Sequence, residues 1–185
     1  MFLRARPTPL DGLTLLERAP VRDHRGFFER LISIEDAPGI FRERRIQQVN
    51  RTLTTRRGTI RGLHFQGDPE PDLKVVTCIR GRVYDLAVDL RSGSATFLAW
   101  HAEILGAHRS ASLVIPEGFA HGFQTLEDDC EMVYVHAGRY RPSAEGGFNA
   151  LDPRLAIPWP EAVTDISDRD RRLPNIPVTF GGIVG

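Results

Sequence analysis

The 185-residue sequence has little cysteine, no long apolar run and no excess charge of either sign. Cys78 and Cys130 are its only cysteines, which excludes a disulfide framework or a cysteine-based metal cluster and fits a reducing compartment. No apolar stretch approaches the ~20 residues that a membrane span needs. The 24 Lys and Arg residues equal the 24 Asp and Glu residues, so no overall field attracts nucleic acid or an anionic membrane.

The N-terminal segment lacks a secretory pattern as well. Residues 1–7 include arginine and proline where a signal peptide needs a continuous apolar stretch. We therefore expect a cytoplasmic protein. The length and a hydrophobic content of 41% are sufficient for one domain with a sizeable core, covering residues 1–185.

Helical periodicity is nearly absent, whereas 17 glycines and 13 prolines separate short apolar stretches, which is typical of an antiparallel sandwich or barrel. Residues 73–79 and 83–90 are predicted to form a hairpin around Gly81. A short helix is expected only within residues 34–44, and the proline-rich segment after Pro142 is expected to wrap the domain as coil. The other predicted strands are residues 58–66, 97–104, 112–115, 122–125 and 131–137.

One predicted strand carries polar groups that a buried strand ordinarily lacks. Residues 58–66 read Gly-Thr-Ile-Arg-Gly-Leu-His-Phe-Gln and so include Arg61 and His64. Strict alternation sends these two side chains to opposite faces, so both line one cavity only if the strand bulges or kinks, and Gly62 is the place for it. The alternative is a hydrogen-bonded core histidine with a surface arginine.

A second segment, residues 115–123, has a P-x-G-x-x-H pattern that ends in His121. Its spacing resembles the second motif of the cupins, which are conical β-barrels. Metal-binding cupins carry an earlier H-x-H motif, but this chain has His64-Phe65-Gln66 in that place. Two imidazoles are too few for a firm transition-metal site, so we expect no bound metal and histidines that are available for acid–base work or substrate contacts.

Lys74 alternates with apolar residues and shares a strand face with Val76 and Cys78. A lysine there needs an anionic partner, or else it extends to solvent from the start of the strand. Tyr134 and Tyr140 fit ordinary core or rim positions when each is taken alone.

The tail contains a dense charge cluster. Residues 167–172 read Ser-Asp-Arg-Asp-Arg-Arg and fit a solvated surface, although a carboxylate in this segment is able to fold back and orient an imidazole. Spacing alone does not choose between Asp168 and Asp170.

Several segments in one order resemble the dTDP-4-dehydrorhamnose 3,5-epimerase family. The resemblance runs from Asp23 to Asp170 and covers nearly the whole chain. Its segments are D-H-R-G-F-F at 23–28, Q-V-N at 48–50, G-T-I-R-G-L-H-F-Q at 58–66, K-V-V at 74–76, G-R-V-Y-D at 81–85, V-D-L-R-S-G-S at 88–94, P-E-G-F-A-H-G-F at 116–123, D-P at 152–153 and S-D-R-D at 167–170.

The resemblance implies a fold and partners. It implies an all-β, cupin-type double-stranded β-helix (jelly-roll) barrel with a few short helices, without metal or other cofactor. The expected ligand is a dTDP-linked nucleotide-sugar, and neither nucleic acid nor membrane is an expected partner. Members of this family pair through strands near their N-termini, so a homodimer is expected.

The resemblance also implies residue roles. His64 matches the family's catalytic base, Asp170 its carboxylate partner, and Tyr134 the proton donor on the opposite face of the sugar ring. Lys74 suits the developing oxyanion at O4, because an enolate is costly in a dry barrel without a cation. Residues at or near positions that contact the nucleotide-sugar are Arg25, Gln48, Asn50, Arg61, His121, Tyr140, Glu145 and Arg169.

The sequence departs from the family pattern in three places. Many members have glutamate five residues after the arginine of R-G-x-F, but this chain has Arg30 there and Glu29 one position earlier. The family's aromatic pair becomes Arg139-Tyr140, and a tryptophan common before Asp-Pro is absent from residues 148–153. These changes lie near the sugar or its base and would suit a different 4-ketosugar or a narrower stereochemical outcome.

The predicted function is a cofactor-independent epimerase that inverts C3 and C5 of a dTDP-4-keto-6-deoxyhexose. The C4 ketone acidifies both neighbouring carbons, so inversion needs a base on one face, an enolate stabiliser and an acid on the other face. The alternatives are an epimerase acting at C3 only or C5 only, a 3,4-ketoisomerase, and a non-catalytic cupin that binds a sugar nucleotide. A metal-dependent oxygenase is disfavoured by the missing H-x-H motif.

Overall fold

The computed structural model describes residues 3–35, 39–41 and 44–184. These residues form fourteen strands and one helix. The elements are β1 (Leu3–Pro7), β2 (Thr14–Arg18), β3 (Val21–Asp23), β4 (Gly26–Phe28), β5 (Gln48–Thr54), β6 (Thr59–Gln66), β7 (Lys74–Arg80), β8 (Arg82–Asp89), β9 (Trp100–Gly106), β10 (Ala111–Ile115), β11 (Phe119–Thr125), β12 (Cys130–His136), β13 (Glu145–Gly147), β14 (Asp165–Ile166) and α1 (Asp168–Arg171).

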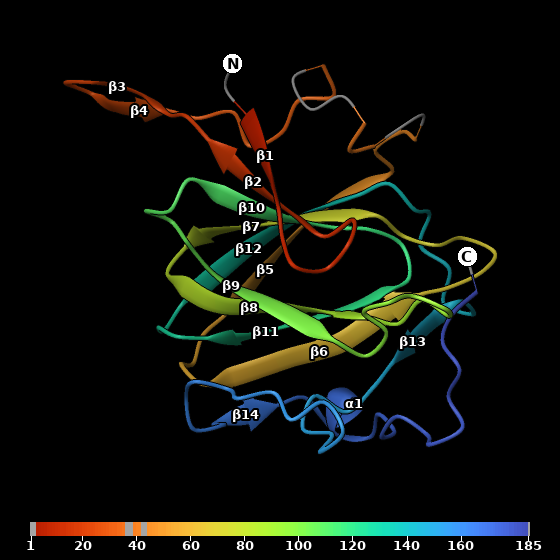
Figure 1. Cartoon of the computed structure of the whole chain (residues 1–185). Helices are drawn as coiled ribbons and strands as arrows, with labels where there is room; N and C mark the ends of the chain where they lie inside the picture. Colours follow the sequence, from red (N-terminus) through yellow and green to blue (C-terminus); the bar gives the residue numbers. More distant parts are fainter. Residues whose placement is uncertain (1–2, 36–38, 42–43, 185) are drawn as a thin grey trace.

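Two sheets stack face to face, as Figure 1 shows. The first sheet has the strand order β1-β2-β10-β7-β12-β5, and the second has β13-β6-β11-β8-β9, with β14 added in parallel along β6. All other pairs in these sheets are antiparallel. A separate hairpin, β3–β4, projects from the body. This is the all-β jelly-roll arrangement that the sequence predicts.

Apolar side chains fill part of the space between the sheets. Leu15, Val76 and Leu113 from the first sheet pack with Val83 and Phe123 from the second, and each is at most 1% exposed. Burial of one such side chain contributes about 1.5–3 kcal/mol. This packing fixes the separation of the sheets, and beyond it the two sheets enclose a cavity.

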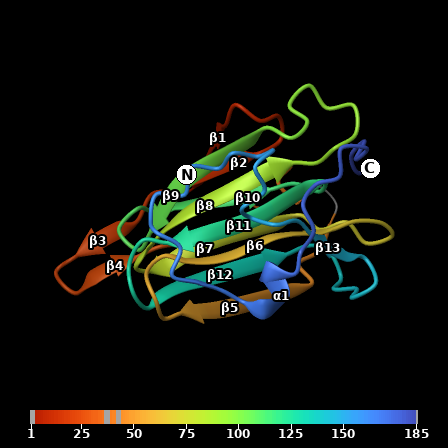
Figure 2. The same ribbon diagram turned by 90° about the horizontal axis from the view of Figure 1, so that it is seen from below.

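The C-terminal segment covers the outer face of the second sheet. Leu155, Ile166 and Ile176 from this segment pack in one cluster with Leu63 and Val88 of the sheet. The predicted wrapping is therefore confirmed, and Figure 1 shows the segment running beneath β6. Contrary to the prediction, the segment is not coil throughout, because it contains β13, β14 and α1. The segment also brings α1 next to β6 (Figure 2).

The predicted hairpin around Gly81 is wrong, although both of its strands form. β7 pairs with β10 and β12 in the first sheet, whereas β8 pairs with β9 and β11 in the second. Gly81 has a φ of +72°, and a Cβ added there would lie 2.6 Å from Cys130 Sγ. The chain therefore changes sheet at Gly81. Alternation identified the strands but not their partners, because strands buried on both faces look alike in sequence.

The helix predicted within residues 34–44 does not form over the described part of that segment, and residues 36–38 and 42–43 lie outside the described residues. Phe41 is 1% exposed and packs on the outer face of the first sheet, so apolar residues in the segment cover the sheet. The helix that does form is α1, which is capped by the Ser167 hydroxyl. Among the described residues, no helix has the length and apolar character needed to cross a membrane.

β6 bulges beside Gly62, as the sequence predicts. In the pairing of β6 with β11, the register shifts by one residue between Arg61 and His64. Gly62 has a φ of +121°, which residues with a side chain rarely adopt. Because the extra residue cancels the alternation, Arg61 and His64 both line the cavity between the sheets.

Gly62→Ala is expected to lower the free energy of unfolding by about 2 kcal/mol or more, because alanine is strained at this φ. A Cβ at this position would also lie 2.6 Å from the Cα of Gly122 and 2.7 Å from the carbonyl oxygen of His121. Urea unfolding measures the change. Gly67→Ala is the matched control, since nothing lies within 4 Å of its added Cβ. Equal stability of the two variants would contradict the need for glycine at the bulge.

Candidate active site

The cavity between the two sheets has a volume of about 570 Å³. Lys74 and Tyr134 line it from the first sheet, and His64 and His121 line it from the second. Asp170 reaches it from α1. The structure thus brings the four expected catalytic residues to a single cavity, together with His121 from the expected binding set.

His64 and Asp170 form a hydrogen-bonded pair at the cavity wall. His64 Nε2 lies 2.8 Å from Asp170 Oδ1, and Asp170 Oδ2 accepts the Gly62 N–H at 3.1 Å. Burial alone would raise the pKa of Asp170, but the hydrogen bonds from His64 and Gly62 outweigh it and the pKa lies below its ordinary value. The carboxylate therefore accepts the Nε2 proton, which leaves the lone pair of the neutral imidazole on Nδ1.

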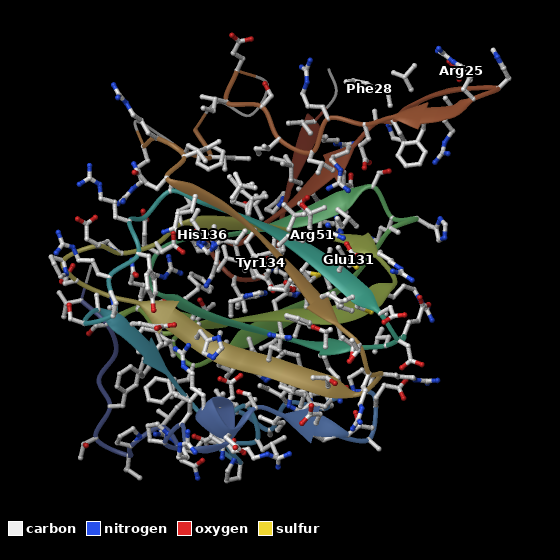
Figure 3. All side chains as sticks on the ribbon, turned by 180° about the vertical axis from the view of Figure 1, so that it is seen from behind. Arg25, Phe28, Arg51, Glu131, Tyr134 and His136 are labelled. Carbon is white, nitrogen blue, oxygen red and sulfur yellow. The ribbon has the colours of Figure 1, made fainter. Side chains whose placement is uncertain are left out.

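Tyr134 occupies the facing sheet, in the middle of β12. Figure 3 shows it at the centre of the molecule. Its ring lies 6.1 Å from that of His121, with an interplanar angle of 71°. Burial raises the pKa of the Tyr134 phenol above its ordinary value, so the group keeps its proton at neutral pH and is an acid rather than a base.

Lys74 is the only lysine in the chain and begins β7. Its side chain is buried, and burial lowers the pKa of its ammonium, while the charges of Asp72, Asp85 and Glu145 act in the opposite direction. No hydrogen bond or ion pair holds the ammonium among the described residues. A buried cation without a fixed partner is suited to a developing negative charge.

His121 is paired with Asp85, a residue that sequence reasoning missed. His121 Nε2 lies 2.9 Å from Asp85 Oδ2, and both side chains are buried. Burial lowers the pKa of His121 against the opposing effect of Asp85, so the ring favours its neutral form. The sequence did contain a sign of this pair, because Asp85 is a carboxylate within the otherwise apolar run of residues 83–88 and so needs a partner when buried.

A second missed pair joins His136 and Asp72 at the same cavity. His136 Nδ1 lies 2.7 Å from Asp72 Oδ2, and both residues line the cavity. The sequence held one signal, because His136 stands two residues after Tyr134 and so shares its strand face.

The other expected binding residues, except Arg25, border the cavity. Arg61 donates to Thr54 Oγ1 at 2.9 Å. Glu145 joins two rim residues, since it accepts the Tyr140 hydroxyl at 3.0 Å and pairs with Arg169 at 2.6 Å. The remaining members lie on β5 and are Gln48 and Asn50.

Arg25 is the exception. It lies at the tip of the β3–β4 hairpin, where its side chain is 79% exposed and pairs with Asp23 at 2.6 Å. Figure 3 shows it far from Tyr134 and His136. Glu29 follows the hairpin and forms an ion pair with buried Arg18, whose Nε lies 3.0 Å from Glu29 Oε1. It does not line the cavity. Within one chain, neither residue reaches the site.

Potential metal ligands do not gather in groups of three or more among the residues that the structure describes. The three cavity imidazoles, His64, His121 and His136, each pair with a separate carboxylate. Without a shared point of convergence, these side chains do not form a metal centre by themselves.

Comparison with known proteins places this chain in a family. The model of the family described as dTDP-4-dehydrorhamnose 3,5-epimerase matches residues 7–177. The chain belongs to the dTDP-4-dehydrorhamnose 3,5-epimerase family. It is a 4-keto sugar epimerase, as the motif order predicted.

Relatives of this epimerase differ in the carbons they invert. A dTDP-4-dehydrorhamnose 3,5-epimerase from Streptomyces griseus is 39% identical over 174 residues, covering 92% of this chain and 86% of that protein. A dTDP-4-dehydrorhamnose 3-epimerase from Streptomyces niveus is 36% identical over 170 residues, covering 91% and 82%. The family of this epimerase therefore includes both double and single epimerases.

A solved structure confirms the cupin fold of this epimerase. The crystal structure of dTDP-4-dehydrorhamnose 3,5-epimerase from Bacillus anthracis with TDP and PPi bound superposes with a TM-score of 0.90 at 36% identity. The match covers 94% of this chain and 99% of that one.

Proposed function

We propose that this epimerase inverts both C3 and C5 of a dTDP-4-keto-6-deoxyhexose. One observation carries the proposal: the carboxylate-paired imidazole of His64 and the phenol of Tyr134 stand on facing sheets of one cavity, which Lys74 also lines. A base and an acid on opposite faces of a sugar ring convert proton exchange into inversion.

The proposed reaction uses His64 as the base. Nδ1 removes the hydrogen from a carbon next to the ketone, and the electron pair moves to O4, which Lys74 stabilises as an oxyanion. Tyr134 then gives its proton to the same carbon from the other face. The imidazolium loses a proton and the phenolate regains one before the second carbon reacts. Because C3 and C5 flank the same carbonyl, one set of groups serves both.

The rim of the cavity supplies cations for the diphosphate. Arg61 and Arg169 both border it, and guanidinium groups bind phosphate oxygens in a bidentate manner. The Bacillus anthracis relative was crystallised with TDP and PPi bound, which supports a dTDP-linked substrate here.

Product stereochemistry determined by NMR tests the proposal. We expect dTDP-4-keto-6-deoxyglucose to give a product inverted at both C3 and C5. A product inverted at one carbon would support the single epimerase, and a 3-keto product would support the ketoisomerase. Binding without any product would support the non-catalytic cupin. Each of these three results would contradict the proposed function.

Tyr134→Phe is expected to reduce inversion about 100-fold or more while leaving hydrogen exchange by His64 much less affected. Phenylalanine keeps the aromatic packing but has no proton to give. Deuterium exchange into recovered substrate and product formation, measured together, separate the two effects. The control is Tyr84→Phe, since Tyr84 packs on Trp159 and does not line the cavity. Equal losses of exchange and inversion would contradict the assigned role.

We also propose a homodimer in which the β3–β4 hairpin docks on a second copy of the chain. Val21, Phe27 and Phe28 on this hairpin are 56%, 56% and 63% exposed, and clustered exposed apolar residues mark interfaces. In such a dimer Arg25 is able to reach the nucleotide-sugar in the other cavity, which reconciles its expected role with its position. Light scattering should give twice the mass of one chain, and a monomer would contradict the proposal.

The cysteines support a cytoplasmic location, which we propose for this epimerase. Cys78 and Cys130 are both buried and unpaired. Burial raises the pKa of Cys78 to about 12, so this thiol stays protonated and unreactive. Unpaired buried thiols are typical of proteins in a reducing compartment.

A further inference from the structure

The proposed reaction uses neither member of the His136–Asp72 pair, although both line the cavity. Asp72 holds His136 firmly, because its Oδ2 lies 2.7 Å from Nδ1 while its Oδ1 accepts the Gly138 N–H at 3.0 Å. The His136 side chain is 20% exposed and lines the cavity. A partly buried imidazole with a fixed orientation and an open side is arranged to contact a ligand.

His136 neighbours both Lys74 and Tyr134, the two groups assigned to the ketone oxygen and to the reacting carbon. It is the cross-strand partner of Lys74 in the pairing of β12 with β7. Its ring stacks on that of Tyr134, with centroids 6.1 Å apart and an interplanar angle of 14°. Figure 3 shows Tyr134 and His136 side by side on β12. Any group that contacts His136 therefore lies near the substituents on either side of the ketone.

The free nitrogen of His136 is a hydrogen-bond acceptor. With Nδ1–H donating to Asp72, the neutral ring carries its lone pair on Nε2. No hydrogen bond or ion pair within the described chain uses Nε2. A 4-keto-6-deoxyhexose linked through O1 has free hydroxyls only at C2 and C3, and the C3 hydroxyl is the neighbour of O4. With Lys74 at O4, an acceptor on the adjacent wall suits the C3 hydroxyl, because the C5 side of the ketone carries a methyl group and no hydroxyl.

We propose that His136, positioned by Asp72, accepts a hydrogen bond from the C3 hydroxyl of the sugar and makes the enzyme selective for C3 configuration. This inference rests on the proposed function, because it needs a 4-keto sugar with O4 at Lys74. Inversion at C3 moves the hydroxyl to the other face of the ring, so the contact favours one C3 epimer. Asp72 is a positioning residue that accepts the Nδ1 proton and so, in the neutral ring, leaves the lone pair on Nε2.

The test compares His136→Asn on two substrates. Asparagine keeps a donor for Asp72 but has no atom at the place of Nε2. We expect kcat/KM for C5 hydrogen exchange to fall about 10-fold on dTDP-4-keto-6-deoxyglucose, which is the effect of one lost hydrogen bond to substrate. On the 3-deoxy counterpart, which lacks the hydroxyl, the variant and the wild type should be equal. His136→Phe, which keeps the stacked ring, should behave in the same way.

Two controls separate this contact from a structural role. His101→Asn changes another carboxylate-paired histidine that does not line the cavity, and it should match the wild type on both substrates. Binding of dTDP alone should be unchanged in His136→Asn if the cavity is intact. Equal losses on both substrates, or no loss on either, would overturn the proposal while leaving the proposed function in place. Absence of exchange in the wild type would instead contradict the proposed function, and this inference with it.

Discussion

His64→Ala is expected to lower hydrogen exchange at both C3 and C5 by about 10²- to 10⁴-fold, the usual contribution of a positioned general base. His64 Nδ1 is the only atom that we assign to proton removal, and both carbons flank the same ketone. Exchange should therefore be lost at C3 and at C5. The loss should appear in kcat rather than in the affinity for dTDP. Deuterium incorporation at each carbon, followed by NMR, is the measurement.

Asp170→Asn provides the matched variant for this prediction. The amide keeps the shape of the carboxylate, but its NH₂ is able to donate to Nε2 and so moves the imidazole proton to Nδ1, the nitrogen that must act as base. We therefore expect a loss approaching that of His64→Ala, with the fold preserved. If His64→Ala retained substantial exchange at either carbon, a different base would have to be assigned.

Lys74→Met is expected to reduce exchange at C3 and C5 together by about 10²- to 10³-fold, because both enolates place their charge on O4. Methionine has a similar length but no charge, and the position is buried, so packing should be retained. Exchange and inversion should fall in parallel, in contrast to Tyr134→Phe. A large loss at one carbon only would contradict a shared oxyanion site.

The pKa of Lys74 also predicts a pH dependence. Burial lowers this pKa, so the ammonium loses its proton at a lower pH than a surface lysine, and activity should fall on the alkaline side as the cation disappears. Because the chain has one lysine, ¹³C-methylated protein gives a single ε-amino resonance to titrate. A titration at or above the ordinary lysine pKa of about 10.4 would contradict burial as the dominant effect.

Local features of the site were readable from the sequence because they follow from alternation and backbone geometry. Arg61 and His64 could line one cavity only if their strand bulged, Gly62 was the expected place, and the structure has this bulge. The placement of Lys74 on the face shared with Val76 and Cys78 is also confirmed, since these two are buried between the sheets. Such inferences need only the alternation of side chains between the two faces of a single strand.

Long-range features were not readable. Alternation does not encode which sheet a strand joins, so the change of sheet at Gly81 was predicted as a hairpin turn. Asp72 and Asp85 were missed because each meets its histidine only after distant strands have paired. Arg25 was expected at the ligand, yet the hairpin that carries it projects away from its own cavity. These positions depend on tertiary structure.

Position-resolved deuterium exchange tests the central claim most directly. Wild type and His64→Ala are incubated with dTDP-4-keto-6-deoxyglucose in deuterium oxide, and NMR follows the label at each carbon. We predict that the wild type incorporates solvent deuterium at C3 and C5, with inversion at both, and that the variant incorporates almost none. A wild type that leaves both carbons unlabelled, or a variant that labels them at the wild-type rate, would contradict the account.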